Sequence, residues 1–416
     1  MIYRQKLSSG MALFLVSSAL SASGFRIPET SIAGLGTANA MVANYKELGS
    51  IPYNPATMSF LEGRNLVVGG AHVKTDIHVD PDNGTATDNT GDSSLFIPHY
   101  YYMSTLNPTW SYGLNINVPF GLETKWPAGT FSSFAGALVS YAPEASRLEM
   151  LNINPNVSYR AGNVSVAFGI NYYDIRTLVF NTQKIRIDGS GGDIGWNIAA
   201  LYVENDLSVG FSYRSPIKVD LDGRLSESIV GTTSDATAST EFPSILQLGA
   251  RYQLNYDWAV EFDIDRTGWS SFDTVNIKHS DTVLISATGK NTITSTNNWK
   301  DTNAYRLGAE YRTDPRGKLR FGYSKDNTAQ DDHYFSARIP DADRQLFSLG
   351  YLRNLKTWGF EIGYMYAKGD ERNINSTTNY LIQAAGGNTD PNGTNAYNGK
   401  YRSNVHILGV GFNIKL

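Results

Sequence analysis

The last nine residues of the chain, Leu408–Leu416, read LGVGFNIKL, with an apolar residue at every second position. Successive side chains of a β-strand point to opposite faces, so this stretch predicts a strand with one apolar face. The other face carries Gly409, Gly411, Asn413 and Lys415. A water-soluble sheet would carry lysine, glutamate and threonine there. A face rich in glycine with few charges instead fits the packed or wet lumen of a barrel.

The same alternation recurs from Arg64 to the end of the chain. It predicts an all-β fold, a transmembrane antiparallel β-barrel of about fourteen strands over residues 64–416. The expected strands are 64–75, 94–105, 108–119, 147–161, 163–179, 193–204, 206–217, 243–255, 257–272, 301–313, 317–326, 344–353, 356–368 and 400–416. Long polar connections follow the odd strands and tight turns follow the even ones, which is typical of outer-membrane barrels. The last strand is free to pair with the first and leave no open edge.

Composition narrows the function classes. Charged residues make up 18% of the 416 residues, below the roughly 25% of soluble globular domains. A net charge of -4 gives no indication of nucleic-acid binding. The absence of cysteine excludes disulfides and thiolate metal sites. We expect no cofactor and no metal.

The first residues have the pattern of a secretory signal peptide. Arg4 and Lys6 form a basic region, and Met11–Leu20 is an apolar stretch too short to span a membrane. Small residues then follow, which predicts a signal peptide over 1–23, cleaved between Ser21 and Gly24. The alternative is a buried N-terminal helix.

Residues 24–63 differ from the rest of the mature chain. Ser31–Met41 is rich in alanine and glycine and lacks strand alternation, and Pro28, Pro52 and Pro55 punctuate the segment. We expect a compact N-terminal hatch of short helices that plugs the lumen of the barrel.

Catalytic motifs are absent. The histidines are scattered, and neither Gly-x-Ser-x-Gly nor His-Glu-x-x-His occurs. Asp80, Asp82 and Asp88 lack the spacing of an EF-hand loop. We therefore expect a protein that is not an enzyme; the alternatives are an outer-membrane lipid-modifying enzyme and a structural or adhesive barrel.

Several blocks, in order, resemble the FadL family of outer-membrane transporters for long-chain fatty acids and aromatic hydrocarbons. The blocks are Gly24-Phe25, Ser31–Gly36, Tyr53–Ala56, Asn117–Leu122, Trp269–Phe272, Asn298–Thr302 and Arg338–Arg344. The resemblance implies passive uptake of a hydrophobic molecule, a hatch in the lumen, and a lateral exit where the third strand kinks. We expect an outer-membrane monomer surrounded by lipid and lipopolysaccharide, with a fatty acid or hydrocarbon as its ligand.

The third strand is the candidate gate. Pro119 cannot donate to a sheet and Gly121 marks bulges, so the segment around Phe120 is expected to break pairing. The alternative is a strand that simply ends in a turn. Asn before Pro favours a turn at Asn54-Pro55-Ala56, and the resemblance places this turn beside the break.

Candidate ligand contacts come from three places. Phe25, near the mature N-terminus, is expected to occupy a lumen pocket, the alternative being a disordered tail. Phe131, Phe134 and Leu138 form, with Ala135, Ala137 and Val139, an apolar cluster in an outer loop. This cluster is either a first landing site for ligand or packing over the barrel mouth.

Charges line one predicted inner wall: Arg251, Glu261, Asp263, Asp265, Arg306, Glu310, Arg312, Lys318 and Arg320. One interpretation is cross-strand ion pairing in a filled lumen. The other is that Arg306 or Arg320 meets an anionic head group, with Lys184 and Arg186 as further candidates.

Overall fold

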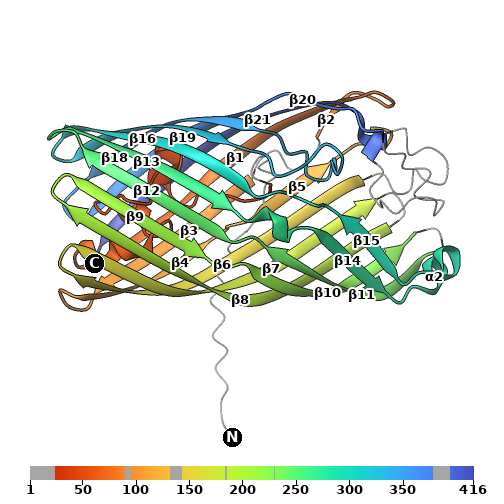
Figure 1. Cartoon of the computed structure of the whole chain (residues 1–416), viewed down its shortest axis with the longest axis horizontal. Coiled ribbons are helices and arrows are strands. Elements are labelled where there is room, and N and C mark those ends of the chain that lie inside the picture. The colour runs from red at the N-terminus through yellow and green to blue at the C-terminus, as the bar shows by residue number, and fades with distance from the viewer. Residues whose placement is uncertain (1–23, 90–94, 132–142, 183–184, 229, 378–393) are drawn as a thin grey trace, which may run out of the picture.

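A computed structural model of the chain describes residues 24–89, 95–131, 143–182, 185–228, 230–377 and 394–416. They form a closed antiparallel barrel of fourteen strands (Figure 1), which confirms the predicted fold class. The strand segments are β1 (Arg64–Pro81), β2 (Thr87–Asp88), β3 (Leu95–Thr105), β4 (Trp110–Asn117), β5 (Gly121–Lys125), β6 (Pro143–Ala161), β7 (Val164–Thr182), β8 (Ile185–Glu204), β9 (Leu207–Arg214), β10 (Ile217–Glu227), β11 (Thr232–Phe242), β12 (Ile245–Gln253), β13 (Trp258–Thr267), β14 (Thr274–His279), β15 (Thr292–Thr296), β16 (Thr302–Asp314), β17 (Gly317–Asp326), β18 (Arg344–Asn354), β19 (Trp358–Gly369), β20 (Arg372–Ile374) and β21 (Gly399–Lys415). The barrel closes because β21 pairs with β1 along the whole of β1 from Asn65 to Pro81.

Some of the fourteen strands consist of two segments in line. They are β2 with β3, β4 with β5, β9 with β10, β11 with β12, β13 with β14, β15 with β16, and β19 with β20. The predicted polar loops after the seventh and ninth strands are therefore partly wrong, because β10, β11, β14 and β15 lie within them. These segments escaped the apolar pattern because their outward side chains are polar, as in Asp220, Thr237 and Asn276.

Nearer the short turns, the outward face of the barrel is apolar. Exposed side chains there include Val166, Phe168, Trp196, Leu248, Phe262, Leu307, Phe347, Ile362 and Phe412. Exposed apolar side chains on alternate positions of neighbouring strands are the lipid-facing band of a transmembrane barrel.

Residues 24–63 lie inside the barrel, towards the end with the short turns (Figure 1). The helices of this hatch are α1 (Ile32–Gly36), η1 (Leu48–Ser50) and η2 (Pro55–Phe60), and further along the chain come η5 (Trp269–Ser271), α2 (Thr282–Thr288) and η6 (Thr394–Tyr397). Ser31 caps α1, its Oγ accepting a 2.9 Å hydrogen bond from Gly34 N. The expected signal peptide, 1–23, lies outside the described residues. No helix in the described ranges is long and apolar enough to cross a membrane.

Candidate functional site

The third strand is interrupted between β4 and β5. Its pairing with β3 stops at Ile116, whereas β3 continues to pair with β1 as far as Leu95. On the other side, Asn117 faces Asn152 and Gly121 faces Glu149, so the third strand carries one extra residue across the break. Within the described residues, β5 has no ladder partner on the β3 side. Proline at 119 removes the donor that continued pairing would need.

The N-terminal segment of the hatch fills this break from inside. Ile27 N donates to Pro119 O over 2.8 Å, and Gly121 N donates to Phe25 O over 3.0 Å. Arg26 and Phe120 therefore form an isolated antiparallel bridge. Since these bonds satisfy backbone groups that the wall leaves open, the N-terminal segment acts as a short substitute strand.

Phe25 lies at the centre of an aromatic cluster. Its ring centroid is 4.6 Å from that of Trp269, and the rings of Phe272, Trp299, Phe120 and Phe242 surround it at 5.3, 5.8, 5.9 and 6.1 Å. The preceding Gly24 has a φ of +66°, and a Cβ there would lie 2.5 Å from Trp299. Only glycine fits this position, because any side chain would collide with the indoles.

A cavity of about 180 Å³ opens beside Phe25. Its lining is mostly apolar and includes Phe25, Leu122, Leu148, Ile175, Leu178, Phe180, Leu221, Phe242, Phe272, Val275, Ile277, Ile293, Trp299 and Ile339. Cations in the lining are Arg147, which pairs with Glu149, and Arg338. The Arg338 guanidinium lies 3.8 Å from the centre of the Phe180 ring, and no carboxylate of the described ranges forms an ion pair with it. The cavity thus combines an apolar body with one half-buried guanidinium, that of Arg338, which has no carboxylate partner in the described ranges.

The end of the lumen that holds the hatch is closed by a layer of buried ion pairs. Arg306 Nε lies 3.1 Å from Asp265, and its Nη2 lies 3.5 Å from Asp326. Arg320 contacts Glu361 at 3.3 Å and the hatch residue Glu47 at 2.8 Å. Buried charges of this kind are tolerated because each has a partner of opposite sign.

The chain matches, over residues 13–416, the family model described as outer membrane protein transport protein (OMPP1/FadL/TodX). It belongs to this family. Outer membrane protein P1 of Haemophilus influenzae is 25% identical, over 90% of this chain and 95% of that protein. The long-chain fatty acid transport protein of Escherichia coli strain K12 is 22% identical, over 89% and 93% of the two chains.

Solved structures share the fold. A Pseudomonas aeruginosa FadL homologue superposes with a TM-score of 0.79 at 17% identity. The superposition covers 94% of this chain and 100% of that chain. The Pseudomonas putida toluene transporter TodX gives a TM-score of 0.70 at 16% identity, covering 96% and 100%. The chain is therefore an outer-membrane protein of a family of channels for hydrophobic substrates, and its relatives are transporters rather than enzymes.

In this FadL-family barrel the charged wall forms ion pairs, and its carboxylates also bind hatch amides that the sequence did not indicate. Asp263 Oδ2 accepts from the hatch amides of Met41 and Val42 at 2.7 and 3.0 Å, and Glu261 accepts from Ala43 N at 2.7 Å. The wall carboxylates thus cap the free amides of the hatch. Sequence periodicity places charges on one face of a strand but cannot show what faces them across the lumen.

The head-group interpretation of Arg306 and Arg320 is not supported. Both side chains are fully buried, already pair with carboxylates, and lie outside the cavity lining. Of the other basic candidates, Lys184 is outside the described residues. Arg186 is exposed and lies 3.3 Å from Asp188. Arg338 was not among the predicted head-group residues, although it begins one of the blocks that resemble the family.

Asn54-Pro55-Ala56 lies elsewhere than expected. Asn54 Nδ2 donates to Val42 O at 2.7 Å and Ala200 O at 3.0 Å, and Ala56 O accepts from Ser165 Oγ at 2.8 Å. The turn therefore packs against the walls of β7 and β8, while the hydrogen bonds at the break come from Phe25 and Ile27. The local sequence was sufficient to predict a turn at Asn54-Pro55. Which wall strands the turn contacts depended on how the whole hatch folds.

The apolar outer-loop cluster is described only at Phe131. This ring is buried and contacts Trp126 and Tyr397, with centroids 5.9 and 5.4 Å apart. That placement matches packing over the mouth. Phe134 and Leu138 lie outside the described residues. Near the first outer loop, Asp88 lies 2.6 Å from His78 Nδ1.

Proposed function

We propose that the protein passively takes up small hydrophobic molecules, fatty acids or hydrocarbons, which bind in the cavity beside Phe25 and leave sideways through the third strand. The observation that carries this proposal is the contact between cavity and break: Phe25 lines the cavity, and its carbonyl bonds to Gly121 in the break. A ligand that displaces the Phe25 ring would also loosen the segment that closes the wall.

The exterior of the break suits such an exit. The outward side chains on the β4 side of the break are Ile116 and Ile153, within the apolar band, and on the β5 side Glu149 is neutralised by Arg147. A hydrophobic molecule leaving there would enter the membrane without crossing water, which favours a lateral route over an axial one. The ion-paired layer at the hatch end opposes axial passage, because opening it would separate buried charges.

Arg338 supports a ligand with a polar or anionic head. A guanidinium with free donors binds a carboxylate through charge-assisted hydrogen bonds, and its stacking on Phe180 holds its plane in place. The rest of the lining offers apolar contact to a chain or ring. This arrangement extends the uptake proposal to both fatty acids and uncharged hydrocarbons.

The surroundings of Gly24 support cleavage of the expected signal peptide just before this residue. Gly24 N lies 3.2 Å from Asp341 Oδ2, and burial raises the pKa of the Asp341 carboxyl to about 6. Cleavage before Gly24 would create an ammonium there, and that positive charge would stabilise the buried carboxylate. The mass of the mature protein should therefore correspond to a chain that begins at Gly24.

A disulfide across the break tests the exit. Arg26 and Phe120 face each other in the bridge without hydrogen bonds to one another. The Cα atoms of such pairs lie about 4.5 Å apart, a distance that a disulfide spans. The native chain has no cysteine, so Arg26→Cys with Phe120→Cys introduces a single pair. Oxidised cells should take up labelled substrate roughly tenfold more slowly, and reductant should restore the rate.

The same protein before and after reduction is the matched control, since both states carry the same substitutions. Equal uptake in the two states would refute an exit that needs the N-terminal segment to leave the break. As a second variant, Pro119→Val with Gly121→Thr should favour continuous pairing of the third strand. It should lower uptake while the purified protein still binds its ligand.

A further inference from the structure

The wall has a second interruption, between β11 and β14. These segments pair only from Ala236 opposite His279 to Ala238 opposite Ile277. Pairing resumes where Ile245 faces Thr267, on β12 and β13. Between these points the described backbone is joined across the gap by Gly268 N, which donates to Ser244 O at 2.9 Å. Helix η5 and Phe272 occupy the length of wall that a continuous ladder would fill.

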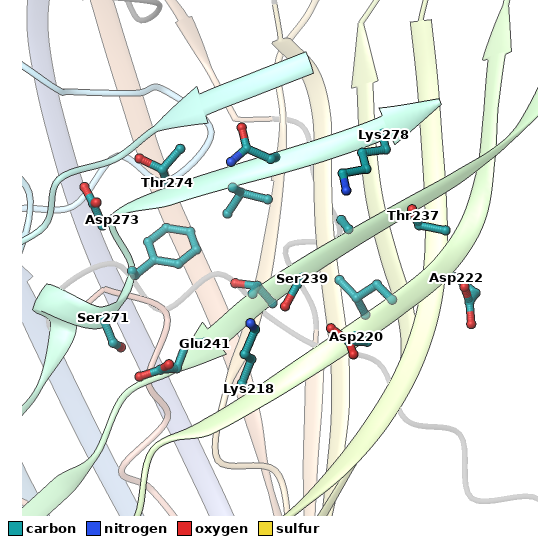
Figure 2. A pocket seen from close by; sticks show the side chains of 16 residues that line it. Lys218, Asp220, Asp222, Thr237, Ser239, Glu241, Ser271, Asp273, Thr274 and Lys278 are labelled. Atoms are coloured by element: carbon teal, nitrogen blue, oxygen red, sulfur yellow. The ribbon is translucent and has the colours of Figure 1, made fainter. Parts of the chain in front are cut away.

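A groove of about 520 Å³ lies over this interruption on the outside of the barrel (Figure 2). Its rim carries side chains from β10, β11 and β14, including Lys218, Glu241 and Thr274. The residues that line both this groove and the inner cavity are Leu221, Thr240, Phe272 and Val275. The groove and the cavity are therefore two sides of the same thin partition of side chains.

Phe272 is the central member of this partition. Its ring is partly buried, lies 5.3 Å from the Phe25 ring and 4.9 Å from Trp299, and belongs to no strand. A side chain outside a ladder moves without breaking backbone hydrogen bonds, so a rotamer change of Phe272 thins this partition at no cost in strand pairing. The third-strand break differs, because a backbone segment closes it.

The two interruptions also open onto different surroundings. Outward side chains on the β4 side of the third-strand break are apolar and the Arg147–Glu149 ion pair lies on its β5 side, whereas those at β10, β11 and β14 are polar or charged throughout. The groove is lined by four carboxylates, those of Asp220, Asp222, Glu241 and Asp273. It has two ammonium groups, those of Lys218 and Lys278. This lining lies beyond the apolar band, on the side of the long loops, and its negative balance disfavours a carboxylate ligand.

We propose that the β11–β14 interruption is an entry window through which uncharged hydrophobic molecules pass from the polar outer layer into the Phe25 cavity. The window rests on the proposed function, since it supplies the cavity that the third-strand break empties. A molecule entering here meets apolar atoms of Leu221, Val275 and Phe272 as soon as it leaves the rim. It bypasses the outer loops over the barrel mouth.

A bulky label at the rim tests the window. Thr274 is exposed and lines the groove, and the chain contains no other reactive thiol, so Thr274→Cys can be coupled to a polyethylene-glycol maleimide after folding. The control is Thr233→Cys with the same label, because Thr233 is exposed on β11 but does not line the groove. The probe is 1-bromooctane, whose bromine quenches indole fluorescence, and Trp299 lines the cavity.

In lipid nanodiscs, and with the third-strand route closed by Pro119→Val and Gly121→Thr, labelled Thr274→Cys protein should bind and release 1-bromooctane about tenfold more slowly at unchanged affinity. A blocked passage slows both directions equally, whereas a distorted cavity changes the affinity. Rates equal to those of unlabelled protein, or a change confined to dissociation, would overturn the window while leaving cavity binding intact. If unlabelled protein bound no 1-bromooctane, the proposed cavity function would fall together with the window.

Discussion

The two ends of the lumen are built from the same strands but are held together by different forces. On the ninth strand, Asp263 and Asp265 face the hatch, and further along the same strand Val275 and Ile277 line the cavity. The charged end is directional, because each carboxylate has a guanidinium or amide at a fixed place. Contacts at the apolar end are not directional, because a ligand can replace the Phe25 ring without leaving a polar group unpaired. The hatch end therefore serves as an anchor, and the cavity end as a contact that a ligand can replace.

The largest expected effect is at the charged end. Arg306→Met removes the partner shared by Asp265 and Asp326, leaving carboxylates buried with fewer charges to neutralise them. Unfolding of the refolded barrel in urea should show a loss of about 3–5 kcal/mol. Arg266→Met is the matched control: its pair with Asp301 is exposed, so the loss should be at most about 1 kcal/mol. If both variants lost similar unfolding free energy, the buried ion pairs would anchor the hatch end no better than an exposed pair.

The next effect is at the apolar end, and it concerns binding rather than stability. Phe25→Ala removes the ring that a ligand must displace, so 1-bromooctane should bind roughly tenfold more tightly. Titration of tryptophan fluorescence measures the affinity. Weaker binding would mean that Phe25 is a wall of the ligand site and not a stopper.

The smallest effect tests the polar part of the cavity. Arg338→Met should weaken dodecanoate binding by about fivefold, because a half-buried guanidinium is partly screened by water. Binding of dodecane should stay the same, and Arg338→Lys should keep most of the dodecanoate affinity because it keeps the charge. Competition against 1-bromooctane gives both affinities. An equal loss for dodecane would show that Arg338 contributes packing rather than charge recognition.

Local pattern was sufficient for most of the wall. Alternation at Leu408–Leu416 and similar stretches predicted the strands, because the side-chain period of a strand does not depend on its partners. The pattern failed at β10, β11, β14 and β15, since strands that leave the apolar band have polar residues outside. Pro216 and Pro243 mark the points at which the recognised segments β9 and β12 meet β10 and β11.

Alternation, glycine content and the ordered family blocks were enough to derive a closed barrel, an N-terminal hatch and a break at Pro119 and Gly121. Which hatch residue contacts which wall residue could not be derived from the residues alone. Phe25, Phe242, Phe272, Trp299 and Arg338 converge on one cavity although they are spread along the whole chain. The physical reason is that each strand fixes only its own inward face, while the curvature and closure of the barrel determine which inward faces meet.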